Sequence, residues 1–446
     1  MPVFSRTRPA LCAAALLAGL AAPVRAQPIP PPPLAAPAAP LAAAATPALV
    51  VATYAAIAQA MYEDALISAK DLQTAVDAFL AAPNAQTLAA ARKAWIEARV
   101  WYQRTEGYRF GNPSVDAMEG KINAWPLDEG LIDYVDVGRY GETNDENPLF
   151  RANVVANARV KVGKAVVDAR RIDRKLLAEK LHEAGGVEAN VATGYHAVEF
   201  LLWGQDLNGT GPGAGNRPAA DYDLKACAHG HCDRRRAYLK AATDLLVDDL
   251  KAMAALWSVG GKARADLAAK TSQDAVAAIF TGLGSLSYGE LAGERMKLGL
   301  LLHDPEEEHD CFSDNTHNSH YFNQAGMTAI WRGVYARRDG VTISGPAPRD
   351  LARAKSTEAA AAVDARFEET TQRLAAIKRM AEEGGKAYDQ MLASGAPEGP
   401  GLIQPAVDAL IAQTRALEAV VAALDLKVKV QGSDSLDDAG KVKPKS

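Results

Sequence analysis

Long stretches of this chain place their apolar residues at the spacing of one helix face, and this pattern restricts the fold more than any other feature. Between positions 57 and 79 the apolar residues recur at intervals of three, four and seven, at Ile57, Met61, Ala65, Leu72, Val76 and Phe79. The spacing returns over 363–377 and 407–424. Such intervals form one stripe along an α-helix. Since aromatic residues make up only 6% of the chain, packed helices are favoured over a β-sandwich.

The helical pattern divides into two segments of similar size. It covers 46–210 and 236–430, and a loop rich in glycine and proline, including 211–235, lies between them. A loop of this length is usually functional or connects two units. We therefore predict an all-α fold of two helical-bundle halves joined by this loop, with a polar tail over 431–446. The similar sizes of the halves suggest an internal duplication.

The N-terminal residues predict export. Arg6 and Arg8 precede an apolar run over 11–22, and Val24-Arg25-Ala26 has small residues at the ends of a cleavage site, so we expect a signal peptide over 1–26. A retained membrane anchor is the alternative. Residues 27–45 are almost entirely proline and alanine, which predicts a semi-rigid linker. We expect the mature protein in a bacterial periplasm.

Composition excludes two further classes of protein. A formal net charge of −5 is unsuited to a generally basic nucleic-acid binder, so we expect no nucleic-acid partner. Beyond the N-terminus, no apolar stretch reaches the roughly 18 residues that cross a bilayer. We therefore expect no transmembrane segment in the mature chain.

A histidine and a glutamate stand three residues apart in an apolar helical segment. His196 and Glu199 lie in Gly194-Tyr195-His196-Ala197-Val198-Glu199-Phe200, and this spacing puts both side chains on one helix face. A divalent cation would satisfy a buried imidazole and a buried carboxylate together. The alternative is a plain hydrogen bond between them within the core. Two ligands hold a metal weakly, so further ligands must come from elsewhere in the chain.

A second helix offers candidates for those ligands. Trp95, Arg99, Tyr102 and Glu106 follow at intervals of four, three and four, which places an arginine and a glutamate on an otherwise aromatic face. This pattern indicates a partly buried polar site or, alternatively, an ordinary surface ion pair. The acids that follow include Asp116 and Glu119, which could supply oxygen ligands. We take Arg99, Glu106, Asp116 and Glu119 as additional site candidates.

Four of the eight histidines cluster between positions 303 and 320. His303, His309, His317 and His320 are mixed there with six acidic residues. Imidazole and carboxylate are the usual ligands of iron, zinc and copper, so this is a candidate second metal cluster. A solvated acidic loop without an ordered ion is the alternative.

Four residues separate Cys227 from Cys232, and His229 and His231 are among them. In an exported protein a local disulfide is the favoured interpretation. A zinc site made from four ligands within six residues would be cramped. The disulfide would leave Cys311 unpaired.

Several of these motifs together resemble one known family. Gly194-Tyr195-His196-Ala197-Val198-Glu199 resembles the Gly-x-His-x-x-Glu signature of the imelysin family. The run from Trp95 to Gly111 and Asn123-Ala124-Trp125-Pro126 look like the first-half pattern of that family. Gly293-Glu294-Arg295-Met296 and the string from Asp304 to His317 resemble its iron-regulated periplasmic branch. The resemblance spans roughly 50–425, and the order of the motifs makes it specific.

The resemblance implies an all-α fold of two bundle halves, export to the periplasm or association with the outer membrane, and a link to iron acquisition. His196 and Glu199 are then the site residues, binding iron, zinc or an iron-bearing ligand, with other iron-uptake proteins of the envelope as partners. The family is also classed among metallopeptidases, so a zinc-dependent peptidase is the alternative function. A third is an adhesion or assembly module in which the pair is only a core hydrogen bond.

Overall fold

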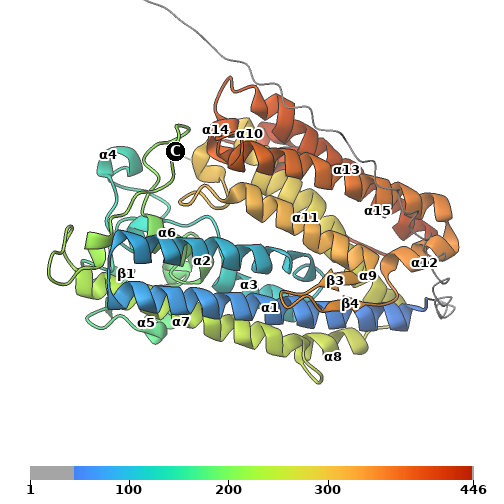
Figure 1. Ribbon diagram of the computed structural model, residues 1–446, viewed down its shortest axis with the longest axis horizontal. Helices are drawn as coiled ribbons and strands as arrows, with labels where there is room; N and C mark the ends of the chain where they lie inside the picture. The colour runs from blue at the N-terminus through green and yellow to red at the C-terminus, as the bar shows by residue number, and fades with distance from the viewer. Residues whose placement is uncertain (1–44, 444–446) are drawn as a thin grey trace, which may run out of the picture. The chain divides into compact units, whose positions relative to one another are not determined.

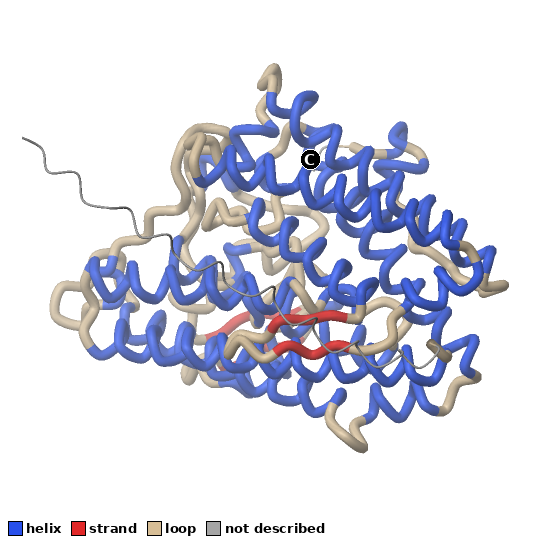
Figure 2. Tube along the Cα trace, turned by 45° about the vertical axis from the view of Figure 1, so that its right-hand side comes forward, coloured by secondary structure: helices blue, strands red, loops and turns tan. Residues whose placement is uncertain are grey.

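The computed structural model describes residues 45–443. The expected signal peptide and all but the last residue of the expected linker lie outside the described residues. The described residues belong to one compact unit. The described part is made of helices with four short strands (Figures 1 and 2), so the all-α prediction is confirmed.

The first group of helices is built around α1. Its members are α1 (Pro47–Ala81), α2 (Ala85–Gln103), α3 (Pro113–Asn123), α6 (Gly194–Trp203) and α7 (Cys232–Trp257). Helix α1 begins where the Thr46 side chain accepts a hydrogen bond from the backbone N–H of Leu49, with Pro47 at the first helical position. The six apolar residues of the predicted stripe are all fully buried on this helix. They pack against α2 and α7.

The second group contains the helices that follow residue 271. They are α9 (Ser272–Ser285), the π-helical segment η6 (Leu286–Lys297), α10 (Leu298–Leu302), α11 (Thr316–Arg332), α13 (Thr357–Glu382) and α15 (Gln404–Ala423). Helix α13 packs between α11 and α15, and α15 packs against η6. Contacts of α2 with α11 and of α1 with α9 join the two groups (Figure 1). An internal duplication stays a prediction.

Helix α7 packs with the first group, although the sequence boundary at 236 assigned nearly all of it to the second. It runs along α1 and contacts α6 and α3. The reason is its apolar stripe, which includes Tyr238, Leu239, Leu246 and Leu250, all fully buried. Loop composition alone does not show which neighbour such a stripe will cover.

The run of helix over Ser272–Leu302 is the one span in the described residues that is long and apolar enough to cross a membrane. However, 83% of its most apolar window is buried inside the protein. This burial is what a core helix of a bundle requires, because its apolar residues already contact other helices.

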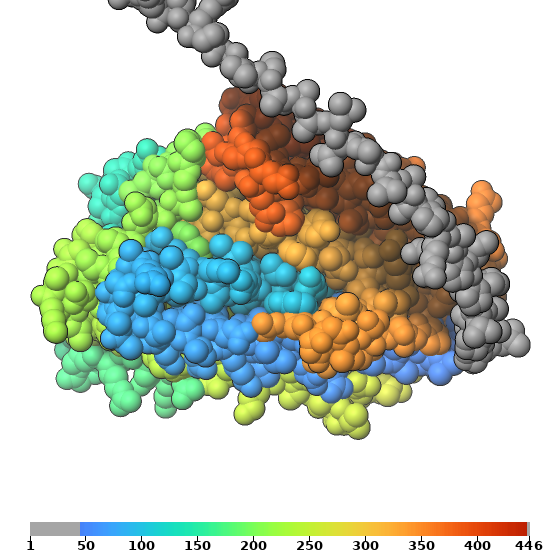
Figure 3. All heavy atoms as spheres, in the orientation of Figure 1, coloured from blue at the N-terminus to red at the C-terminus, as the bar shows by residue number. Residues whose placement is uncertain are grey.

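Two small antiparallel hairpins lie on the helices. Strands β1 (Arg159–Val162) and β2 (Ala165–Asp168) pair with Val160 opposite Val167, and β3 (Val334–Ala336) and β4 (Thr342–Ser344) pair with Tyr335 opposite Ile343. The second hairpin covers part of α1 (Figure 3). There Asp64 accepts hydrogen bonds from the Tyr335 hydroxyl at 2.8 Å and from Arg337 at 3.0 Å.

Short elements fill the connections. The helices are α4 (Val137–Tyr140), α5 (Arg174–Leu176), α8 (Lys262–Ala268), α12 (Pro348–Lys355), α14 (Tyr388–Leu392) and α16 (Asp434–Asp437). The 3₁₀ and π segments are η1 (Glu106–Tyr108), η2 (Glu129–Leu131), η3 (Leu177–Leu181), η4 (Ala184–Gly186), η5 (Ala219–Tyr222), η7 (Pro305–Glu307), η8 (Gly399–Ile403) and η9 (Ala439–Lys441). Helix α16 in the polar tail packs against η6, where the Ser435 hydroxyl donates to the Gly293 carbonyl at 2.9 Å.

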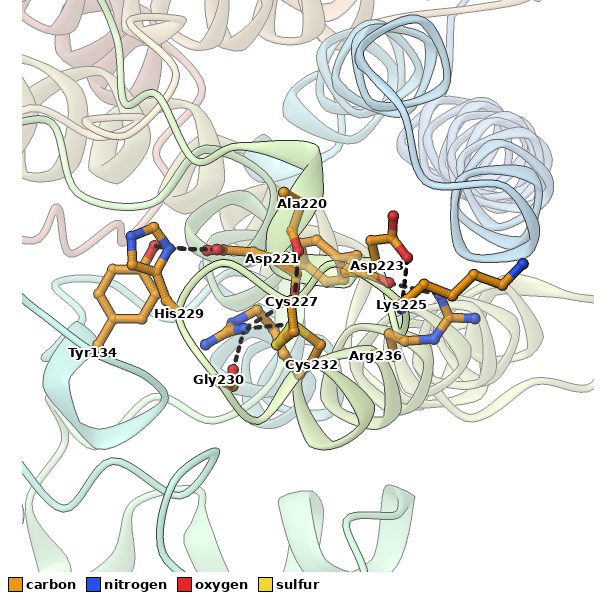
Figure 4. Close-up of a disulfide and its surroundings, with 12 residues drawn as sticks. Tyr134, Ala220, Asp221, Asp223, Lys225, Cys227, His229, Gly230, Cys232 and Arg236 are labelled. Atoms are coloured by element: carbon orange, nitrogen blue, oxygen red, sulfur yellow. Dashed lines mark hydrogen bonds and ion pairs between the residues drawn. A yellow bond between two sulfur atoms is a disulfide. The ribbon is translucent and has the colours of Figure 1, made fainter.

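The loop between α6 and α7 is tied to the body of the protein by charge. Asp133 accepts from Arg217 at 2.6 Å and from Arg235 at 2.5 Å, and all three side chains are only 1% exposed. Cys227 and Cys232 form a disulfide in this loop, beside His229, whose Nδ1 lies 2.5 Å from Asp221 (Figure 4). Cys311 is the free cysteine among the described residues.

Candidate metal centre

Helix α6 carries the predicted His-x-x-Glu pair into the protein interior. Each of its ten residues, from Gly194 to Trp203, is buried. It begins at Gly194, whose φ of +80° is a conformation that L side chains rarely adopt. A Cβ atom at this position would lie 2.5 Å from the Ile122 carbonyl oxygen at the end of α3. Glycine is therefore required for α6 to approach α3 closely and to place the residues that follow.

We expect Gly194→Ala to destabilise the protein more than Gly186→Ala. Gly186 also has a positive φ, of +77°, but a Cβ there would meet nothing within 4 Å, so its cost is the left-handed conformation alone, about 1–2 kcal/mol. Gly194→Ala adds the clash with Ile122, at about 1–3 kcal/mol for overpacking. Urea denaturation of both variants measures the difference. Equal losses of unfolding free energy would show that α3 moves away at no cost.

His196 and Glu199 contact each other directly. His196 Nδ1 lies 2.9 Å from Glu199 Oε2, and the other carboxylate oxygen accepts from the Ser313 backbone N–H at 3.0 Å and the Ser313 hydroxyl at 2.6 Å. His196 Nε2 is buried and has no hydrogen-bond partner among the described residues. Glu199 thus orients the imidazole, and Nε2 is the atom left to bind a ligand.

The segment between η7 and α11 brings a second histidine to the His196 ring. The rings of His196 and His309 have centroids 5.0 Å apart. One ligand atom each from His196, His309 and Asp310 lie within 4.8 Å of one another, and all three side chains are buried. Trp125 packs edge-on against the His309 ring, with centroids 5.8 Å apart. Residues from α6 and from the segment before α11 therefore meet at one point.

Arg99 on α2 holds the carboxylate of this group. Its guanidinium donates to Asp310 Oδ1 at 2.7 Å, and both side chains are 0% exposed. Asp310 Oδ2 accepts from Ser319 at 2.6 Å and from Asn315 at 2.9 Å. An ionised carboxylate has about four lone-pair sites, so these three bonds leave Asp310 able to bind one further group.

The electrostatics keep the histidines neutral. Burial and the positive charge of Arg99 lower the pKa of His196 to about 3, and burial with Arg295 and Arg99 places the pKa of His309 well below its ordinary value. Burial raises the pKa of Asp310, but Arg99, His196 and the hydrogen bond from Ser319 together lower it to about 2. Burial and the Asp310 charge raise the pKa of Glu199 well above its ordinary value. Two neutral imidazoles thus face an ionised aspartate at neutral pH.

These residues fit a metal ion. Two imidazoles and one carboxylate form the donor set that suits iron and zinc. A histidine that binds a metal almost always has its other ring nitrogen hydrogen-bonded to a carboxylate or carbonyl, which is the relation of Glu199 to His196. The unpartnered, buried Nε2 of His196 is the observation that a ligand would explain.

The four additional candidates from the second helix and its surroundings occupy different places. Arg99 lies in the group. Glu106 is buried nearby and pairs with Arg295 at 2.6 Å. Burial raises the pKa of Glu119 to about 7, and its Oε1 accepts from Asn123 at 3.3 Å. Asp116 is half exposed and pairs with Arg109 at 2.8 Å, so it lies outside the group.

The four clustered histidines also occupy different places in the structure. His309 joins His196, whereas exposed His303 has its Nδ1 2.8 Å from the Leu392 carbonyl. His317 Nε2 lies 3.1 Å from the Asn318 amide. His320 is fully buried with its ring against Tyr388, and neither nitrogen has a hydrogen-bond partner among the described residues. Residues 307–310 and 315–320 are buried, so the alternative of a solvated loop is wrong for them.

Sequence reasoning did not identify Asp310, Ser313 or Arg295 as site residues. Asp310 directly follows His309 in the acidic string, which was a usable local signal. The contacts of Ser313 with Glu199 and of Arg295 with Glu106 join positions more than a hundred residues apart. No local spacing indicates such contacts.

Comparison with known proteins places this geometry in a family. The model of the imelysin family matches residues 58–417, which is most of the chain. The chain belongs to the imelysin family. An iron-regulated protein A of Synechococcus elongatus (strain ATCC 33912 / PCC 7942 / FACHB-805) is 35% identical over 71 residues, or 16% of this chain and 20% of that relative.

Solved structures share the imelysin fold seen here. A protein described as an iron-regulated protein A precursor from Parabacteroides distasonis ATCC 8503 superposes with a TM-score of 0.60 at 16% identity, covering 86% of this chain and 96% of that one. An imelysin-like protein from Psychrobacter arcticus 273-4 gives a TM-score of 0.53 at 14% identity, covering 87% of this chain and 99% of that one. At these identities the likeness shows a common fold.

Proposed function

We propose that this imelysin-family protein binds one transition-metal ion, iron or zinc, through His196, His309 and Asp310. Glu199 orients His196 through the hydrogen bond at Nδ1, and Arg99 holds Asp310 through their ion pair. In this assignment Glu199 supports a ligand without binding the metal itself. The other two ligands, His309 and Asp310, come from the segment before α11. The single observation that carries the proposal is the buried Nε2 of His196, which has no hydrogen-bond partner among the described residues, on a side chain that lies within reach of a second imidazole and a carboxylate.

Metal loading of the purified chain tests this function. After removal of metals with EDTA, Zn²⁺ or, without oxygen, Fe²⁺ is added and the unbound ion is removed. We expect about one equivalent of bound metal by elemental analysis, and a raised melting temperature because a ligand that binds only the folded state stabilises it. A wild-type chain that retains no metal in either case would contradict the proposal.

The affinity for Zn²⁺ is expected to rise with pH through Glu199 and not through the histidines. The pKa of His196 is about 3, so the imidazole has no proton to lose at neutral pH. The pKa of Glu199 is raised, and its carboxyl must ionise before His196 Nδ1–H can donate to it and leave Nε2 open. Below the pKa of Glu199, affinity should rise about tenfold per pH unit.

Glu199→Gln separates these sources of pH dependence. The variant should bind Zn²⁺ about 10–100-fold more weakly at high pH, as is typical when an outer hydrogen-bond partner is lost. Its affinity should change little between pH 6 and 8. Competition titrations with a chelating dye at both pH values measure this. If the affinity of the variant rose with pH as steeply as that of the wild type, the proton released on binding would come from a group other than Glu199.

A zinc-dependent peptidase is the second candidate function, favoured by the resemblance of two histidines and one acid to catalytic zinc sets. Against it, His196 is 1% exposed and Glu199 is 0% exposed, which leaves a polypeptide no access to the ion. Cleavage of an unfolded protein that is abolished by EDTA and lost in Glu199→Ala would favour the peptidase over the binding protein.

We further propose that the protein acts outside the cytoplasm, in the periplasm or at the outer membrane, within iron acquisition. The disulfide between Cys227 and Cys232 supports an oxidising compartment. The name of the Synechococcus relative, iron-regulated protein A, supports the link to iron. On this proposal its partners are an iron-bearing ligand and other iron-uptake proteins of the envelope.

A further inference from the structure

Three carboxylates outside the histidine group converge on one point. Glu308 follows η7, Asp314 precedes α11, and Asp389 lies on α14. One carboxylate oxygen from each lies within 4.8 Å of the others. The three residues therefore join the segment that carries His309 to a helix about 80 positions further along the chain.

Glu308 provides the observation that a bound cation would explain. Its side chain is 0% exposed, and neither carboxylate oxygen has a hydrogen-bond partner among the described residues. Asp389 is 1% exposed, and its oxygens also lack a hydrogen bond of ordinary geometry there. An ionised carboxylate buried without a partner is costly and is normally paired with a cation or bound to a metal. Both side chains point to the same small volume.

Among residues 45–443, no lysine, arginine or histidine forms an ion pair with these three carboxylates. The charged groups that most affect the three carboxyls are themselves carboxyls, including Asp206 on the loop after α6. Burial, followed by these neighbours, raises the pKa of Asp314 and of Asp389 to about 7 each.

We propose that Glu308, Asp314 and Asp389 bind one hard divalent cation, Ca²⁺. The three donors are all carboxylate oxygens, which hard cations prefer, whereas the neighbouring group offers two imidazoles. A Ca–O distance of about 2.3–2.6 Å allows donor oxygens on opposite sides of the ion to be up to about 5 Å apart, in line with the limit of 4.8 Å. Mg²⁺ needs shorter bonds and keeps several waters, so it fits this buried set less well.

Calcium titration of the full, metal-stripped chain tests the site. Isothermal titration should give one bound Ca²⁺ per chain, and the melting temperature should rise with Ca²⁺ and rise less with the same free Mg²⁺. Asp389→Asn should abolish both Ca²⁺ responses. In the metal-free state it should melt at or above the wild-type temperature, because it removes one charge from a crowded group. Glu97→Gln, on the exposed face of α2, should behave as wild type.

The result separates this site from the histidine group. Asp389→Asn should still bind Zn²⁺ with wild-type stoichiometry, and His196→Ala should still bind Ca²⁺. Glu308→Gln repeats the test if Asp389→Asn does not fold. A wild-type chain without calcium binding, an equal response to Mg²⁺, or calcium binding that survives both substitutions would overturn the proposal, whatever the outcome for zinc.

Discussion

Replacing His196 with alanine is expected to abolish tight binding of Zn²⁺ and Fe²⁺. The imidazole supplies one of three donors that lie within 4.8 Å of one another, together with His309 and Asp310. The two donors that remain would hold an ion weakly. The loss should exceed the 10–100-fold typical of an outer partner such as Glu199. Elemental analysis after loading and buffer exchange should show less than a tenth of the wild-type metal.

A matched histidine variant gives the control. His317 lies nearby, is 8% exposed and has Asn318 as a partner, so His317→Ala should keep one equivalent of metal. Circular dichroism of both variants checks that the helices are retained. If His196→Ala stays folded and binds metal as the wild type does, the ion is held elsewhere and the proposed function is wrong.

Replacing Asp133 with asparagine is expected to cause the largest loss of stability. Arg217 and Arg235 both pair with this carboxylate, and all three side chains are only 1% exposed. Removing the negative charge leaves Arg235 buried without a counter-ion and leaves Arg217 with Asp221 alone, at 3.2 Å. Breaking buried ion pairs in this way costs about 3–5 kcal/mol. The Gly/Pro-rich loop should detach from the body first, because Arg217 lies within it.

Urea denaturation at neutral pH measures this loss. Burial raises the pKa of Asp133, but Arg217 and Arg235 lower it by more, so it lies below its ordinary value. The stabilisation is thus fully present above about pH 4 and is lost as the pH falls through the pKa of the folded state. Asp168→Asn, which removes an exposed pair with Arg170, should leave stability unchanged. A wild-type stability for Asp133→Asn would show that Asp221 and solvent compensate for the lost carboxylate.

Local spacing predicted those features that depend on one helix. The stripe from Ile57 to Phe79 is buried as expected, and the three-residue interval of His196 and Glu199 does bring their side chains to 2.9 Å. Both follow from helix geometry, which repeats every few residues.

Contacts between distant segments could not be predicted in this way. His309 was found as one of four clustered histidines, but nothing in the string distinguished it from His303, which is exposed. The partner of Arg99 is Asp310, more than 200 positions away. Which acid meets which arginine depends on how the two groups of helices pack, and a single sequence does not encode that in any local interval.

Complete burial of α6 has a consequence for the speed of metal exchange. An ion held by His196 has no route to solvent while the helix is enclosed, so its release must wait for transient opening of the surrounding helices. Dissociation would then run at the opening rate, whatever the concentration of a competing chelator. The backbone amides of Gly194–Trp203 should exchange with deuterium on the same timescale. Metal dissociation and amide exchange would then report the same opening motion.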